Sequence, residues 1–118
     1  MSEFAHLTGF RREILAAIAA LEAEPGQVYG QAIKGRLEER LGEEVLHGRL
    51  YPNLDELVEC GLVEKSAIDD RSNRYLLADG VREQLAEEGW RLVHLAEDLA
   101  LEDGGTVDGS VRTLRGEQ

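Results

Sequence analysis

Hydrophobic residues recur at steps of three and four along the first third of the chain, a period typical of amphipathic helices. Residues 7–22 place their apolar side chains on one face, and Thr8 stands where an N-cap is expected. The proline and glycine in the following AEPGQ end this helix. Residues 29–41 carry an apolar residue at every fourth position, and Gly42 after them is typical of a C-cap. The pattern predicts two helices joined by a short connection.

A third helix is predicted in HGRLYPNLDELVECGLVE, residues 47–64, because its leucines fall on one side. Pro52 is tolerated only in the first turn of a helix, where its missing N–H costs little. This helix is therefore expected to begin near Gly48 or Arg49 and to end at Gly61.

Two short strands and a long helix are predicted next. Residues 62–68 and 73–77 have strand patterns, and the polar DDRS connects them. The long helix is expected to run from Asp79, as its cap, to about Leu101, with apolar residues spaced like a seam that packs on another helix. The glycine-rich end of the chain is expected to be loosely ordered.

The order of these elements predicts a winged helix-turn-helix, in the class α+β and mostly α, with a long C-terminal dimerisation helix. A chain of 118 residues suits a single modest core. We expect residues 1–78 to form the winged-helix domain, residues 79–101 the dimerisation helix, and residues 102–118 a flexible polar tail.

The chain is strongly acidic, with 24 Asp and Glu against 13 Lys and Arg and a net charge of -11. Only Lys34 and Lys65 are lysines; the other bases are arginines. Acid excess with few lysines is typical of proteins from a salt-saturated cytoplasm, where salt screens the repulsion between surface carboxylates. An acidic protein from an ordinary cytoplasm is the alternative.

Several functional classes have no support in the sequence. No apolar segment is long enough to cross a membrane and no signal peptide is present, so a cytoplasmic location is expected. One cysteine and three dispersed histidines offer no metal-ligand cluster, and no cofactor or nucleophile motif of an enzyme is found.

The third helix carries the candidate chemistry, because the second helix of a helix-turn-helix enters the major groove by its N-terminal residues. Arg49 and Asn53 fall opposite the leucine side near that end, whereas Glu56 and Glu59 lie toward the other end. Arginine pairs with guanine and asparagine with adenine, and a helix N-terminus attracts phosphate. We expect this end to meet double-stranded DNA; an ordinary solvated surface is the alternative.

The hairpin and the second helix add basic candidates for DNA contact. Arg71 lies at the predicted tip with Lys65 and Arg74 on the strands, where arginine reaches a narrow minor groove. Lys34 and Arg36 are candidate phosphate contacts that equally fit solvated helix surface. The full candidate set is Lys34, Arg36, His47, Arg49, Tyr51, Asn53, Lys65, Arg71 and Arg74.

The long helix predicts self-association, because its apolar residues have no further domain to cover them and need a partner surface. The residues expected there are Leu85, Leu92, Ala96 and Leu99.

Cys60, near the end of the third helix, suggests redox sensing. Its acidic neighbours do not favour a reactive thiolate, so a buried inert cysteine is the alternative.

Three stretches resemble the PadR family of winged-helix transcription regulators: VYGQAIKGRLEERLG, LHGRLYPNLDELVECGLVEK and SNRYLLADGVREQL. The resemblance runs from about Leu15 to Leu85, with Ala78 replacing the usual threonine. It implies a homodimer on a pseudo-palindromic operator, with the C-terminal helix packed on the partner's first helix, here Phe10 and Ile14. It also implies a small-molecule effector. The acidic surface points to the haloarchaeal branch, which includes an oxidative-stress regulator.

A protein-interaction module that does not bind DNA is the rival function, since some winged helices bind proteins and an acidic one resembles DNA in charge. If DNA is the partner, cations must be taken up between carboxylates and phosphates. We therefore expect affinity that stays flat or rises with KCl, unlike the steep loss of cationic DNA-binding proteins.

Overall fold

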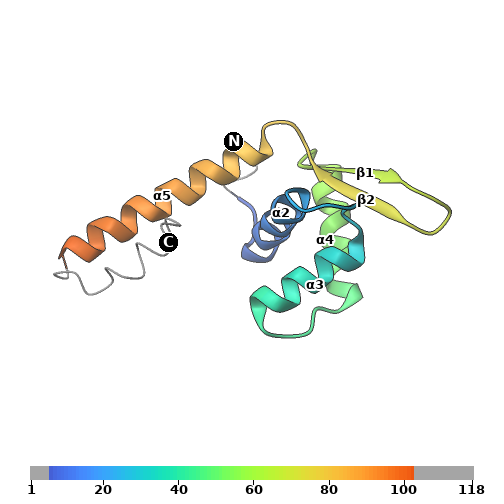
Figure 1. Ribbon diagram of the computed structural model, residues 1–118, viewed down its shortest axis with the longest axis horizontal. Helices are drawn as coiled ribbons and strands as arrows, with labels where there is room; N and C mark the ends of the chain where they lie inside the picture. The colour runs from blue at the N-terminus through green and yellow to red at the C-terminus, as the bar shows by residue number, and fades with distance from the viewer. Residues whose placement is uncertain (1–5, 103–118) are drawn as a thin grey trace. The chain divides into compact units, whose positions relative to one another are not determined.

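The computed structural model describes residues 6–102 and confirms the winged helix-turn-helix (Figure 1). The chain divides into two units, Met1–Arg82 and Glu83–Gln118, each described by itself. Of the predicted tail, residues 103–118 lie outside the described residues, whereas Glu102 is the last residue of α5. The elements in chain order are α2 (Gly9–Glu22), α3 (Gly30–Leu41), α4 (His47–Glu59), β1 (Val63–Ala67), β2 (Asn73–Leu77) and α5 (Val81–Glu102).

Helices α2 and α3 begin and end as their flanking residues predicted. The Thr8 side chain accepts a hydrogen bond from the Arg11 backbone N–H at 3.3 Å, which caps α2. Gly42 ends α3 with a φ of 73° and donates its N–H to the Glu38 carbonyl at 2.9 Å. A left-handed residue at this place favours glycine, because a Cβ there meets the neighbouring backbone.

Helix α4 begins earlier than expected, and the predicted place of Pro52 is wrong. Because the helix starts at His47, Pro52 falls in its second turn, where it removes the hydrogen bond to the Gly48 carbonyl. The helix continues past it because its leucine side is fully buried in the core. It ends at Glu59, and Gly61, with a φ of 81°, follows in the turn.

The core lies among α2, α3 and α4 and is closed by the two-stranded wing. The strands are antiparallel, with Lys65 opposite Tyr75, and the Tyr75 side chain is 3% exposed. The Tyr75 N–H donates to the Val28 carbonyl at 2.9 Å, which holds the segment before α3 against β2. The start of α3 therefore lies beside the wing, as Figure 1 shows. The fully buried large side chains include Ile14, Leu15, Ile18, Ile33, Leu37, Val45, Leu50, Leu54 and Leu57.

Helix α5 begins at Val81, so the prediction that Asp79 caps it is wrong. Asp79 and Gly80 form a turn, and Gly80 has a φ of 86°. Glu22 at the end of α2 holds both sides of this turn. Its carboxylate accepts a hydrogen bond from the Leu77 N–H at 2.7 Å and forms an ion pair with Arg82.

Candidate nucleic-acid interface

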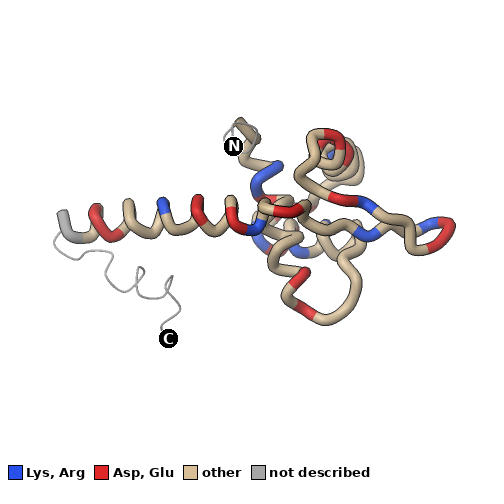
Figure 2. The backbone as a smooth tube through the Cα atoms, turned by 90° about the horizontal axis from the view of Figure 1, so that it is seen from above, with Lys and Arg blue, Asp and Glu red and all other residues tan. Residues whose placement is uncertain are grey.

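The exposed surface of α4 changes in charge along its length. Its first turn contains no acidic residue, whereas Asp55, Glu56 and Glu59 are all exposed in its second half. Figure 2 shows acidic and basic residues interspersed along the chain. The positive end of the α4 dipole is thus left without a nearby carboxylate on its own first turn, as an anion-binding end requires.

Arg49 lies on the exposed part of that first turn but is held by its neighbours. Its guanidinium carbon stacks over the Phe10 ring at 3.8 Å from the centroid, and one of its nitrogens lies 3.8 Å from a Glu43 carboxylate oxygen. Its side chain is 49% exposed. The contact with Phe10 places α2 beside the start of α4 and gives Arg49 a preferred direction.

Asn53 differs from the prediction, because it is half-buried rather than on the open side of α4. Its Oδ1 accepts from Arg11 Nε at 2.7 Å, and its Nδ2 donates to the Arg49 carbonyl at 2.7 Å. Both ends of the amide are therefore used within the protein. The spacing of residues along α4 could not predict this contact, because Arg11 belongs to a different helix, α2.

Besides Arg49, three more of the predicted lysine and arginine candidates pair with carboxylates. Lys34 Nζ lies 2.8 Å from Glu38 Oε2, and this hydrogen bond raises the pKa of the lysine and lowers the pKa of Glu38. The remaining two pairs are Arg36 with Glu24 at 2.6 Å and Lys65 with Asp55 at 3.7 Å.

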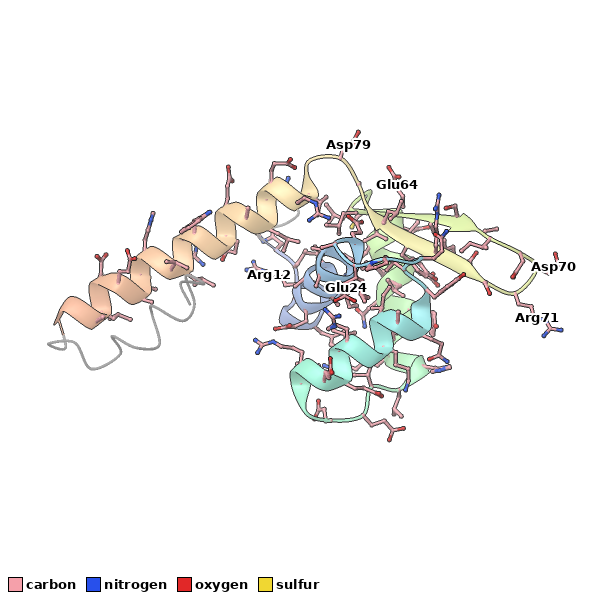
Figure 3. All side chains as sticks on the ribbon, in the orientation of Figure 1. Arg12, Glu24, Glu64, Asp70, Arg71 and Asp79 are labelled. Carbon is pink, nitrogen blue, oxygen red and sulfur yellow. The ribbon has the colours of Figure 1, made fainter. Side chains whose placement is uncertain are left out.

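The wing carries arginines that have no carboxylate partner among the described residues. Arg74 hydrogen-bonds to the Ser66 hydroxyl at 3.2 Å and to the Gln27 side-chain oxygen at 3.1 Å. Arg71 extends from the tip of the hairpin (Figure 3). These two side chains keep their positive charge available for a partner.

Asp69, two residues before Arg71, stabilises the hairpin turn. Its carboxylate accepts the backbone N–H groups of Arg71 at 2.9 Å and of Ser72 at 2.8 Å, which lowers the pKa of Asp69. Asp70 stays exposed beside it.

Of the two aromatic candidates of α4, Tyr51 lies against the start of α3. His47 and Tyr51 form an edge-on pair with ring centroids 5.4 Å apart. Tyr51 packs so closely on Gly30 that a Cβ at that glycine would overlap the tyrosine hydroxyl. Between them and the wing lies a hollow of about 390 Å³, lined by residues 29–32, Tyr51, residues 71–73 and Tyr75.

The predicted dimer residues fall into two groups. Ile14 is fully buried in the protomer's own core, which argues against its predicted place at an interface. Phe10 is half-buried under Arg49. On α5, Leu92 and Leu99 are each 50% exposed, and Leu95, which the seam pattern missed, is 48% exposed between them. Leu85 and Ala96 are half-buried.

Cys60 is half-buried at the end of α4, with its Sγ 3.7 Å from the Leu57 carbonyl oxygen. Redox sensing by this thiol stays a prediction.

Within residues 6–102, no cluster of potential metal ligands is found. The helices among those residues include none that is long and apolar enough to span a membrane.

A comparison with protein families matches residues 18–87 to the transcriptional regulator PadR-like family. The chain belongs to this family. The match covers the segment from α2 through the wing into the start of α5, and it confirms the resemblance that the three sequence stretches predicted. The family consists of transcription regulators and not of enzymes, in agreement with the lack of a catalytic motif.

Solved structures place the chain near one relative within the family. One is a structure of RosR from H. salinarum, grown from NaBr, whose sequence is 39% identical to this chain. The match has a TM-score of 0.65 and covers 84% of this chain and 94% of that one. A complex structure, hsRosR-S1, has 39% identity and a TM-score of 0.64, covering 86% of this chain and 95% of that one.

More distant structures share only the fold. PadR of Bacillus subtilis in complex with operator DNA is 17% identical, with a TM-score of 0.50 over 93% of this chain and 78% of that one. No curated protein sequence matches the chain.

Proposed function

We propose that the chain is a cytoplasmic transcription regulator that binds a pseudo-palindromic site on double-stranded DNA as a homodimer at high salt. The observation that carries the proposal is the pair of wing arginines, Arg71 and Arg74, which contact no carboxylate among the described residues. They lie on the same winged-helix unit as the acid-free first turn of α4. Membership of a family of transcriptional regulators supports the same choice of partner.

In this proposal the start of α4 enters the major groove and the wing lies along the adjacent backbone or minor groove. Arg49 is the base-reading candidate, held in direction by Phe10. Asn53 is proposed to support Arg49 and the helix, because its amide is occupied by Arg11 and the Arg49 carbonyl. Lys34 and Arg36 lie 2.8 Å and 2.6 Å from their carboxylates and must exchange them for a phosphate, so their effect should be smaller. The carboxylates near Arg49 and Lys65 lie farther away, at 3.8 Å and 3.7 Å.

The salt dependence of affinity tests the proposal. Binding to the DNA upstream of the protein's own gene, measured by fluorescence anisotropy from 0.2 M toward molar KCl, should stay flat or increase (roughly a threefold change or less). Cations taken up between exposed carboxylates and phosphates offset those released from the DNA. A steep loss of affinity over this range would contradict the high-salt part of the proposal.

Arginine substitutions test the place of binding. Arg71→Ala should weaken binding to all duplexes by about three- to tenfold, because a phosphate or minor-groove contact is lost. Arg91→Ala is a matched control, since Arg91 lies on α5 and pairs with Glu88 at 2.5 Å. Equal effects of the two variants would show that only net charge matters.

The rival proposal is a protein-interaction module, favoured by the exposed acids of α4. A duplex that gives no gel shift over a scrambled control, together with recovery of one protein partner, would favour it.

Cys60 is the residue through which a response to oxidative stress would act. A Cys60→Ser variant that still releases DNA on peroxide treatment would end that hypothesis.

A further inference from the structure

All three tyrosines of the chain line one hollow between the start of α3, α4 and the wing. Tyr29 and Tyr51 approach it from the beginning of α3 and from α4, and Tyr75 comes from β2. Tyr75 as a whole is 3% exposed, and its hydroxyl makes no hydrogen bond to another described residue. Because Tyr75 lies in the wall of the hollow and its hydroxyl is not sealed in the core, the hydroxyl is able to donate to a group that enters this space.

The same hollow is lined by backbone donors. Gln31 and Ala32 lie at the second and third positions of α3, where amide groups have no acceptor within the helix. No side chain caps this end, and its first turn contains no acid. A 12-residue helix therefore presents its uncompensated positive end to the space that the tyrosines surround.

The charges around the hollow are also unequal. Arg71 lines it and has no carboxylate partner among the described residues. Asp55 acts electrostatically on Tyr75, but Lys65 lies 3.7 Å from that carboxylate and offsets it. Burial, with smaller effects of Tyr51 and Asp55, raises the pKa of Tyr75, so its hydroxyl stays protonated and able to donate.

We propose that this hollow binds one phosphodiester group of the DNA backbone, with the Tyr75 and Tyr51 hydroxyls, the start of α3 and Arg71 as donors. The inference rests on the proposed DNA-binding function. It joins Tyr51 and Arg71, which the sequence analysis proposed as separate DNA contacts, to Tyr75 and the start of α3 in one site. Donors from three elements around one positive end fit an oxyanion. A net charge of -11 disfavours capture of a small free anion, whereas DNA is also held by the rest of the interface.

The proposed site requires a glycine at position 30. A side chain there would overlap the Tyr51 hydroxyl and push that ring into the hollow. Gly35, in the same helix, offers a matched control because a Cβ at Gly35 meets no atom within 4 Å. The pair of substitutions therefore separates filling the hollow from changing a glycine of α3.

The first test is duplex binding by variants that keep the core. Tyr75→Phe removes the hydroxyl but retains the ring, and should weaken binding to all duplexes about five- to tenfold, the effect of one hydrogen bond to a charged group. Gly30→Ala should weaken binding at least as much, and Gly35→Ala should not. Thermal melting of each variant separates these losses from unfolding. Wild-type affinity in Tyr75→Phe and Gly30→Ala would overturn the site while leaving the DNA-binding function intact.

The second test locates the phosphate. Duplexes in which one phosphate at a time is replaced by a neutral methylphosphonate should include a position that weakens the wild type but causes no further loss in Tyr75→Phe. Strictly additive losses at every position would overturn the site.

The third test separates DNA from free phosphate. The amide resonances of Gln31 and Ala32 are followed by NMR during titration with potassium phosphate against potassium chloride at equal ionic strength. Shifts in a protein that binds no duplex would identify a site for free phosphate and overturn both the DNA function and the DNA-bound role of the hollow. In a protein that also binds duplex, free phosphate should shift these resonances less than duplex does, because the net charge of -11 repels a small anion. Loss of the duplex-induced shifts in Gly30→Ala would support the site.

Discussion

Arg11 Nε donates to Asn53 Oδ1 at 2.7 Å, across 42 residues of sequence. The contact ties the first turn of α2 to the second turn of α4. Phe10, the neighbour of Arg11, stacks against Arg49 from the same turn. The start of the recognition helix is thus positioned by α2, and the side chain that the sequence assigned to adenine instead supports the helix from the side.

The Arg11–Asn53 contact should be measurable as a coupling energy. Arg11→Ala, Asn53→Ala and the double variant, compared by urea unfolding, should give a coupling of about 1 kcal/mol because the contact is partly buried. The exposed pair of Arg36 and Glu24 is the control and should give a smaller coupling, because solvent screens it. Equal couplings for the two pairs would contradict a special role for Asn53.

Gly42 and Gly35 should respond to alanine with opposite signs. Gly42 has a φ of 73°, so Gly42→Ala should lower the free energy of unfolding by about 1 kcal/mol. Gly35 lies inside α3 with open space around it, so Gly35→Ala should raise the free energy of unfolding by up to about 1 kcal/mol. Chemical denaturation of both variants checks the difference, and the same sign for both would refute the assignment of Gly42 as the cap.

Glu38 should make stability depend on acid pH. Its carboxylate accepts from Lys34 Nζ and from the Val45 N–H at 2.9 Å, which lowers the pKa of Glu38 below its ordinary value of 4.5. A lowered pKa in the folded state means that the contribution is present above pH 4.5 and is lost as pH falls through the folded value. Wild type should therefore be more stable than Glu38→Gln at pH 7, and the difference should shrink below pH 4.5. A difference that does not change with pH would exclude the ionised form as its source.

Leu95 should matter for self-association. It lies between Leu92 and Leu99 on α5 and is 48% exposed, so Leu95→Glu should shift the oligomeric state toward monomer if this face joins two protomers. Ala86 lies on the opposite side of the same helix by its spacing of nine residues, and Ala86→Glu is the control. Sedimentation velocity at high salt measures both. A dimer unaffected by Leu95→Glu would place the interface elsewhere.

The sequence alone determined the elements and their order, because these depend on local signals. Periodic leucines, the cap at Thr8, the left-handed Gly42 and the DDRS turn each act within a few residues. Local signals were insufficient where packing opposed them. Pro52 was expected in a first turn, yet burial of the α4 leucines keeps the helix continuous through it.

Only the tertiary structure decided which charges are available. Along the sequence, Arg49, Arg36 and Arg71 are equivalent positive charges. Folding brings Glu43 to Arg49 and Glu24 to Arg36, and it leaves Arg71 without a carboxylate among the described residues. The gathering of three tyrosines around one hollow is likewise invisible in a chain where they lie more than twenty residues apart. Pairing and enclosure depend on distances in space between segments remote in sequence, and these are fixed only when the core forms.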